Sequence, residues 1–99
     1  MSELHAVATI PAKPEAVDAI RAALQTLVAA TRAEEGCLSY DLYESGAAPG
    51  VFITMERWVD QAAMDAHLQM PHVAEAFAAA DGALAGEVAI HPLMPVEVG

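Results

Sequence analysis

The stretch that links strand to helix in this chain is Glu56-Arg57-Trp58-Val59-Asp60-Gln61-Ala62-Ala63-Met64-Asp65-Ala66-His67. It follows an apolar run from Val51 to Met55, whose β-branched and aromatic residues favour a strand. Asp60 is a suitable helix N-cap, and the residues after it are mostly good helix formers. Met64, His67 and Leu68 recur at helical spacing, so we expect His67 on the buried face of a helix, against a sheet.

Before this stretch, the pattern predicts strand, helix and strand. Residues 3–10 alternate between apolar and polar positions and form a first strand. Pro14 suits a helix start, and an apolar stripe then runs along residues 15–33 at helical spacing: Val17, Ile20, Leu24, Leu27, Val28 and Thr31. Gly36 ends this helix or turns the chain after it. Residues 38–43 alternate as a second strand, in which Leu38, Tyr40 and Leu42 share one face.

The turn residues 45–50 make a hairpin of this second strand and the strand that begins at Val51. After His67, Pro71 allows a further helical piece over residues 72–80, and residues 87–93 alternate as a fourth strand. The order β-α-β-β-α-β predicts an α+β, ferredoxin-like split βαβ fold with a four-stranded antiparallel sheet. Helices cover one face of such a sheet, yet the third strand is apolar on both sides. We therefore expect the other face to meet a partner.

Length, composition and charge limit the domain number, the partners and the location that we expect for this protein. Ninety-nine residues make a single domain, residues 1–99, and 56% of them are hydrophobic. A net charge of −10, with four Lys and Arg in total, argues against a nucleic-acid partner. No apolar run approaches the roughly 20 residues of a membrane span, and the N-terminus shows no signal peptide, so we expect no membrane partner and a cytoplasmic location. The single cysteine, Cys37, fits a reducing compartment.

The motif residues resemble a known family. Glu56-x-Trp58-x-Asp60, Ala63, His67 and Pro71-His72, with the upstream run from Glu34 to Tyr40, are similar to the signature of the antibiotic biosynthesis monooxygenase (ABM) domain, and most similar to its quinol monooxygenase branch. The resemblance covers nearly the whole chain. It implies a homodimer whose sheets pair into a dimeric α/β barrel, and oxidation of a small electron-rich aromatic substrate, such as a quinol or phenol, by O2 without a cofactor.

Residue roles follow from the resemblance together with the faces of the predicted elements. His67 is the expected proton acceptor, and Trp58 or Tyr40 the expected donor to the substrate oxyanion. Substrate contacts are expected from Phe52, Thr54, Glu56, Met64, Leu68, His72 and Phe77. By itself, a histidine on a buried helix face is typical of a hydrogen-bonded core residue.

We expect neither a metal nor another cofactor. The sequence has no glycine-rich nucleotide loop, and a metal site needs at least three converging ligands. His67 and His72 are five residues apart across a proline, which is not the spacing of two ligands on one helix face. Haem-degrading relatives carry a tryptophan at the position of His67 and a haem-ligating histidine at that of Phe77, so both haem signatures are absent.

Two other functions stay open. One branch of the family isomerises a small phosphorylated signal metabolite, and the low number of basic residues disfavours that role here. The chain could also be a non-catalytic dimer that binds an apolar ligand. Some polyketide-oxidising relatives have an asparagine where Thr54 is the nearest equivalent, which weakens the case for their substrates.

Overall fold

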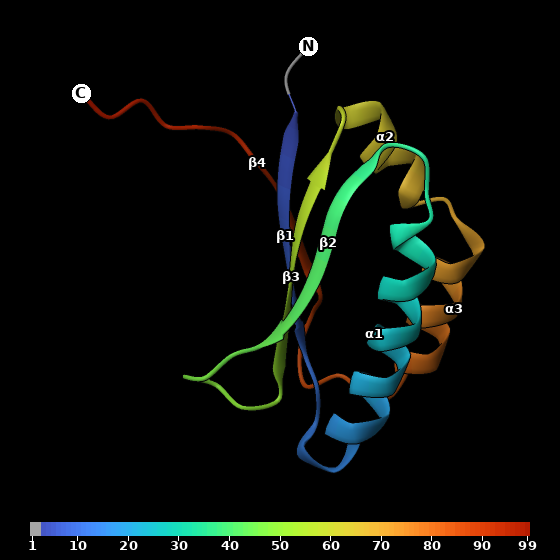
Figure 1. Cartoon of the computed structure of the whole chain (residues 1–99). Coiled ribbons are helices and arrows are strands. Elements are labelled where there is room, and N and C mark those ends of the chain that lie inside the picture. The colour runs from blue at the N-terminus through green and yellow to red at the C-terminus, as the bar shows by residue number, and fades with distance from the viewer. Residues whose placement is uncertain (1–2) are drawn as a thin grey trace.

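A computed structural model describes residues 3–99 as one antiparallel sheet with its helices packed on one face (Figure 1). The elements, in chain order, are β1 (Leu4–Pro11), the 3-10 turn η1 (Pro14–Ala16), α1 (Val17–Arg32), β2 (Cys37–Glu44), β3 (Val51–Trp58), α2 (Gln61–His67), α3 (Pro71–Ala80) and β4 (Ala89–Leu93). Each element expected from the sequence is present, and boundaries differ by a few residues. Within residues 3–99, none of the helices combines the length and apolar character needed to cross a membrane.

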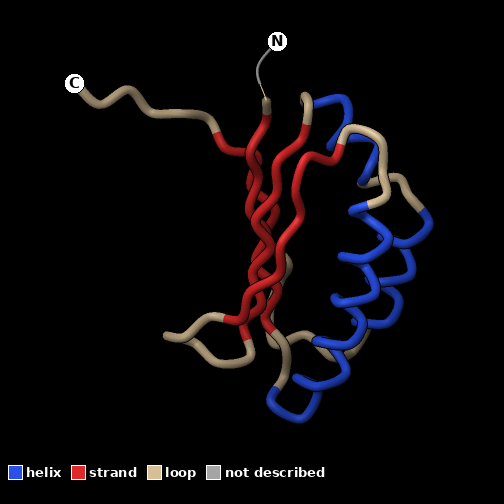
Figure 2. The backbone as a smooth tube through the Cα atoms, viewed as in Figure 1, coloured by secondary structure: helices blue, strands red, loops and turns tan. Residues whose placement is uncertain are grey.

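The strand order is β2-β3-β1-β4, and every neighbouring pair is antiparallel. β1 and β3 form the centre of the sheet, and each crossover passes over the same face, where Figure 2 shows all the helices. This is the split βαβ arrangement, so the predicted α+β, ferredoxin-like fold is confirmed. The opposite face of the sheet carries no helix of the described chain (Figure 2).

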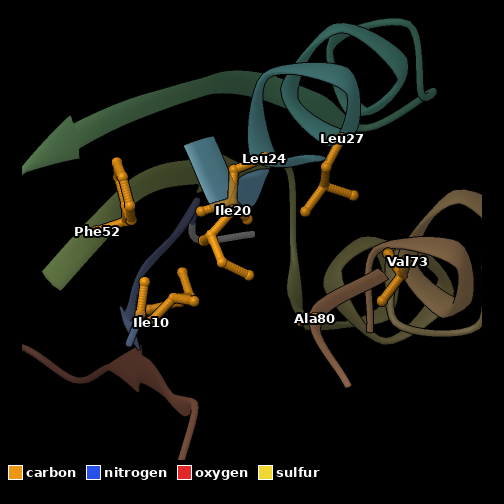
Figure 3. Close-up of a cluster of buried hydrophobic side chains, with 9 residues drawn as sticks. Ile10, Ile20, Leu24, Leu27, Phe52, Val73 and Ala80 are labelled. Atoms are coloured by element: carbon orange, nitrogen blue, oxygen red, sulfur yellow. The ribbon is translucent and has the colours of Figure 1, made fainter. Parts of the chain in front are cut away.

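The main core lies between α1, α3 and the sheet (Figure 3). The stripe predicted for α1 is the buried one, since Ile20, Leu24, Leu27, Val28 and Thr31 are its buried residues. Ile20, Leu24 and Leu27 share one cluster with Phe52 of β3 and with alternate residues of β1, as the two-residue period of a strand requires. The cluster consists of Ala8, Ile10, Ala12, Ile20, Leu24, Leu27, Phe52, Val73 and Ala80.

A β-bulge changes one predicted face. The register of β2 against β3 shifts between Cys37 and Ser39, so that Cys37 lies opposite Trp58. Cys37 consequently packs against the cluster around Trp58, whereas Leu38 is 46% exposed. Leu38 was expected to share the buried face of Tyr40, and that expectation was wrong because a bulge adds a residue to one strand and reverses the alternation.

The chain between β3 and α3 is shaped by a cap and a proline. The Asp60 carboxylate accepts a hydrogen bond from the Ala63 N–H, as predicted for the N-cap of α2. α2 ends at His67, and Met70 adopts an extended backbone before Pro71 begins α3. A proline cannot continue a hydrogen-bonded helix but suits the first turn of a new one. The helix is therefore interrupted between His67 and Pro71, and α3 begins as a separate helix close to the end of α2.

Candidate functional site

A small apolar cavity lies between the sheet and the helices. Its volume is about 60 Å³. His67, Tyr40 and Glu56 are the polar residues in its wall. The remaining walls are aliphatic, apart from Phe77: Ala8, Ile10, Leu24, Leu27, Met64, Leu68, Val73, Ala76, Phe77, Ala80, Val88 and Ile90. Because Phe77 also has 48% of its surface exposed, we take it to mark the mouth of the cavity.

His67 is held by a carboxylate on the far side of its ring. Its Nδ1 lies 2.7 Å from Oε2 of Glu34, and Nε2 of His72 lies 2.6 Å from the same oxygen. The side chains of Glu34 and His67 are only 7% and 5% exposed. The three groups come from three places in the chain: the turn after α1, the end of α2 and the start of α3.

The turn after α1 places Glu34. The Glu34 N–H donates to the carbonyl of Thr31, and the Cys37 N–H donates to the carbonyl of Glu34. Gly36 has a φ of +91°, and a Cβ at this position would lie 2.8 Å from the Cβ of Ala63 in α2. Only glycine allows both the left-handed backbone and this close approach. The turn is thereby seated against α2, and Glu34 reaches His67.

These contacts fix the tautomers. An ionised carboxylate only accepts hydrogen bonds, so with Glu34 ionised His67 carries a proton on Nδ1, and His72 carries one on Nε2. In the neutral form of His67, Nε2 then holds the lone pair. The ring also packs against Trp58 at 4.8 Å between centroids and against the edge of Tyr40 at 5.5 Å. His67 is thus a positioned imidazole with one nitrogen available for a proton.

A second buried carboxylate belongs to Glu56, and it has its own partners. Thr54 Oγ1 donates to one of its oxygens at 2.6 Å, and Trp58 Nε1 donates to the other at 3.0 Å. Thr54, Glu56 and Trp58 occupy every second position of β3, so their side chains share one face of the strand. The buried Glu56 carboxylate is thus held by two neighbours on its own strand.

Tyr40 lies on the buried face of β2, beside His67 and Trp58. Burial raises the pKa of the Tyr40 hydroxyl far above its ordinary value, and the nearby Glu56 carboxylate raises it further. Tyr40 therefore keeps its proton at neutral pH. It is suited to donate a hydrogen bond and unsuited to act as a base.

The predicted site residues separate into two groups. His67, Tyr40, Glu56, Met64, Leu68 and Phe77 line one cavity. Trp58, Thr54, Phe52 and His72 do not. The Trp58 side chain is fully buried with its N–H bonded to Glu56, and Phe52 lies in the main core. His72 contacts Glu34 instead of the cavity.

Sequence reasoning missed Glu34 as a site residue. It was recognised only as part of the turn motif, because nothing local shows that the turn seats against α2. The spacing of His67 and His72 also gave no sign that the two rings lie close together. They are not on one helix face, but the break before Pro71 leaves the two ring centroids 6.1 Å apart.

Comparisons with known proteins show the family of this chain. Residues 4–79 match the model of the family described as antibiotic biosynthesis monooxygenase. The protein named "Putative monooxygenase Rv0793" of Mycobacterium tuberculosis is 38% identical over 96 residues, which are 97% of this chain and 94% of that protein. "Putative monooxygenase YcnE" of Bacillus subtilis is 40% identical over 65 residues, 66% of this chain and 68% of that protein.

Solved structures share the whole fold. The structure of Rv0793 has a TM-score of 0.87 and 36% sequence identity, and covers 98% of both chains. The structure of PA3566 from Pseudomonas aeruginosa has a TM-score of 0.87 and 33% identity, with coverage of 98% of this chain and 97% of that one. Since the family model spans most of the chain and a relative matches over nearly its full length, this chain belongs to the antibiotic biosynthesis monooxygenase family.

Proposed function

We propose that this protein is a monooxygenase that oxidises a small electron-rich aromatic substrate of the quinol or phenol type with O2, without metal, haem or flavin. The family and the names of the relatives support a general monooxygenase role. The observation that carries the finer proposal is His67, an imidazole held by Glu34 through Nδ1 in the wall of an apolar cavity.

The first step is a proton transfer. A quinol hydroxyl in the cavity gives its proton to Nε2 of His67, and the Glu34 carboxylate stabilises the imidazolium that results. The O–H of Tyr40 donates to the developing oxyanion, a role that its raised pKa permits at neutral pH. The apolar walls exclude water, which strengthens both interactions.

The substrate itself supplies the electrons for the oxidation. The quinolate passes one electron to O2, and the resulting superoxide and substrate radical combine at a ring carbon to form a peroxide. Loss of water from the peroxide leaves a hydroxyquinone. One oxygen atom enters the product and the other leaves in water, so hydroquinol plus O2 gives hydroxyquinone plus water, and no external reductant is needed.

Oxygen uptake with hydroquinols in the presence of chelator tests this function. We expect the wild type to consume O2 in a protein-dependent manner, with water and the hydroxyquinone as products. Activity that is lost to chelator and restored by one particular metal would contradict the cofactor-free chemistry. Ligand binding without oxygen uptake would point to the non-catalytic alternative, and turnover of a phosphorylated metabolite without oxygen to the isomerase.

The variant His67→Ala tests the role of His67 as the general base. It should lower turnover by about 10²–10⁴-fold, the usual contribution of a general base. His91→Ala is the matched control, since His91 is an exposed histidine of β4 that does not line the cavity, and it should keep wild-type turnover. Thermal unfolding of both variants shows whether the fold is intact. Full activity of a folded His67→Ala protein would remove His67 from the mechanism.

A further inference from the structure

We propose that Glu34, His67 and His72 form a binding site for a divalent first-row transition metal ion such as Zn²⁺ or Co²⁺. The site goes beyond the oxidation chemistry above and stands on its own geometry. Two imidazoles and one carboxylate are a frequent ligand set for such ions, and three protein ligands leave a position open for water.

The donor atoms already converge. Nδ1 of His67, Nε2 of His72 and a carboxylate oxygen of Glu34 lie within 4.8 Å of one another. The two N–O separations are 2.7 and 2.6 Å. Ligand atoms around a tetrahedral ion with bonds of about 2.1 Å are about 3.4 Å apart. An ion can therefore replace the two bridging protons if the N–O separations widen by less than about 1 Å and the two nitrogens, at most 4.8 Å apart, close to about the same spacing.

The charge of Glu34 is not balanced by a basic side chain. The chain has four Lys and Arg residues, and within residues 3–99 all of them bond elsewhere. Lys13 bonds a carbonyl, and Arg21, Arg32 and Arg57 bond other carboxylates. A carboxylate this buried needs hydrogen-bond donors or a bound cation, because an unpaired buried charge is costly. For the Glu34 carboxylate, only the two imidazoles or a bound cation can be such a partner.

An ion can reach the site from the surface. His72 lines a second hollow of about 260 Å³, and it does not line the cavity that contains His67. Its other lining residues come from α1 and α3: Ala23, Thr26, Leu27, Glu75, Ala76 and Ala79. His72 is also more exposed than its two partners, at 17% of its side chain. The ligand set thus has a buried side and an accessible side, as an exchangeable metal site requires.

Metal binding has a consequence for the proposed oxidation, and this one consequence rests on that function. A metal on Nδ1 of His67 leaves the ring proton on Nε2. The imidazole then cannot accept a proton from the substrate. We therefore expect the ion to inhibit turnover and a chelator to restore it.

Titration of the tag-free, chelator-treated protein with Co²⁺ and Zn²⁺ tests the site. The wild type should bind one ion per chain, with cobalt d–d absorption bands in the visible region. Glu34→Gln and His72→Ala should each weaken binding by at least about 10–100-fold, because losing a ligand costs no less than losing an outer-shell partner of a ligand. Glu75→Gln is the matched control, since it removes a carboxylate from the same hollow without removing a proposed metal ligand. This variant should bind the ion as the wild type does.

A measurement on the wild type covers the case in which a variant fails to fold. Substoichiometric Co²⁺ should shift or broaden the ring resonances of His67 and His72 before those of His5 and His91. Absence of binding by the wild type, equal binding by folded Glu34→Gln protein, or first effects at His5 or His91 would each overturn the site. None of these readouts uses turnover, so they stand apart from the test of the monooxygenase function.

Discussion

Gly36 is the residue on which the position of Glu34 depends. Its φ of +91° lies in the left-handed region, and a Cβ there would meet the Cβ of Ala63 at 2.8 Å. Gly36→Ala should therefore destabilise the protein by about 1–3 kcal/mol, because it adds a steric clash to the cost of the backbone conformation. Denaturant unfolding measures this change.

Gly82→Ala isolates the contribution of the clash. Gly82 also has a positive φ, +79°, but a Cβ there would have no neighbour within 4 Å. Gly82→Ala should add only the backbone strain, so it should lower the free energy of unfolding by less than Gly36→Ala does. Equal losses for the two variants would show that the seat between the turn and α2 contributes nothing to stability.

The hairpin of β2 and β3 is joined to α1 by an ion pair. Arg21 in α1 contacts Glu44 at 2.8 Å, and the Gly50 N–H donates to the other oxygen of Glu44. The Arg21 guanidinium, and then the Gly50 N–H, hold the pKa of Glu44 below its ordinary value. A carboxyl whose pKa is lower in the folded state stabilises that state above its unfolded pKa. This stabilisation is lost as the pH falls through the folded value.

Glu44→Gln should therefore flatten the pH dependence of stability. The difference in Tm between wild type and variant should be largest near neutral pH and shrink as the pH falls from about 5 toward 3. Glu87→Gln, at an exposed position before β4, is the control and should follow the wild-type profile. A difference in Tm that does not change with pH would show that the pair contributes packing rather than charge.

The type and order of the helices and strands could be predicted from the sequence. Alternation predicted β1, β2 and β4, the apolar β-branched run from Val51 predicted β3, and the apolar stripe predicted α1. Asp60 and Pro71 predicted the starts of α2 and α3. Local patterns did not predict features that depend on tertiary contacts. The bulge at Cys37–Ser39 places the Leu38 side chain on the other face of the sheet, and the turn before Pro71 brings His72 beside Glu34. The site was predicted in part for the same reason: cavity residues share a face, whereas Glu34 is identified only by packing.

At the scale of the whole molecule, no helix of residues 3–99 covers one face of the sheet (Figure 1). On that face Val7 is paired with Met55 on one side and His91 on the other, and Ile53 is paired with Tyr43. Met55 and Tyr43 are 51% and 54% exposed. Beyond β4 the chain extends away from the sheet, and Met94, Val96 and Val98 are each more than 80% exposed. Apolar surface of this extent is typical of an interface.

We expect a homodimer in which this face meets its copy, the arrangement that the dimeric α/β barrel would give. A charge placed there should break the dimer, because burying an unpaired carboxylate is costly. Met55→Glu should therefore yield monomers, or unfolded protein if the monomer is unstable, at micromolar concentrations where the wild type is dimeric. Ala78→Glu adds the same charge to an exposed position of α3, on the helical side, and should leave the dimer intact. Analytical ultracentrifugation with thermal unfolding distinguishes these cases, and a well-folded wild-type monomer at those concentrations would exclude the dimer.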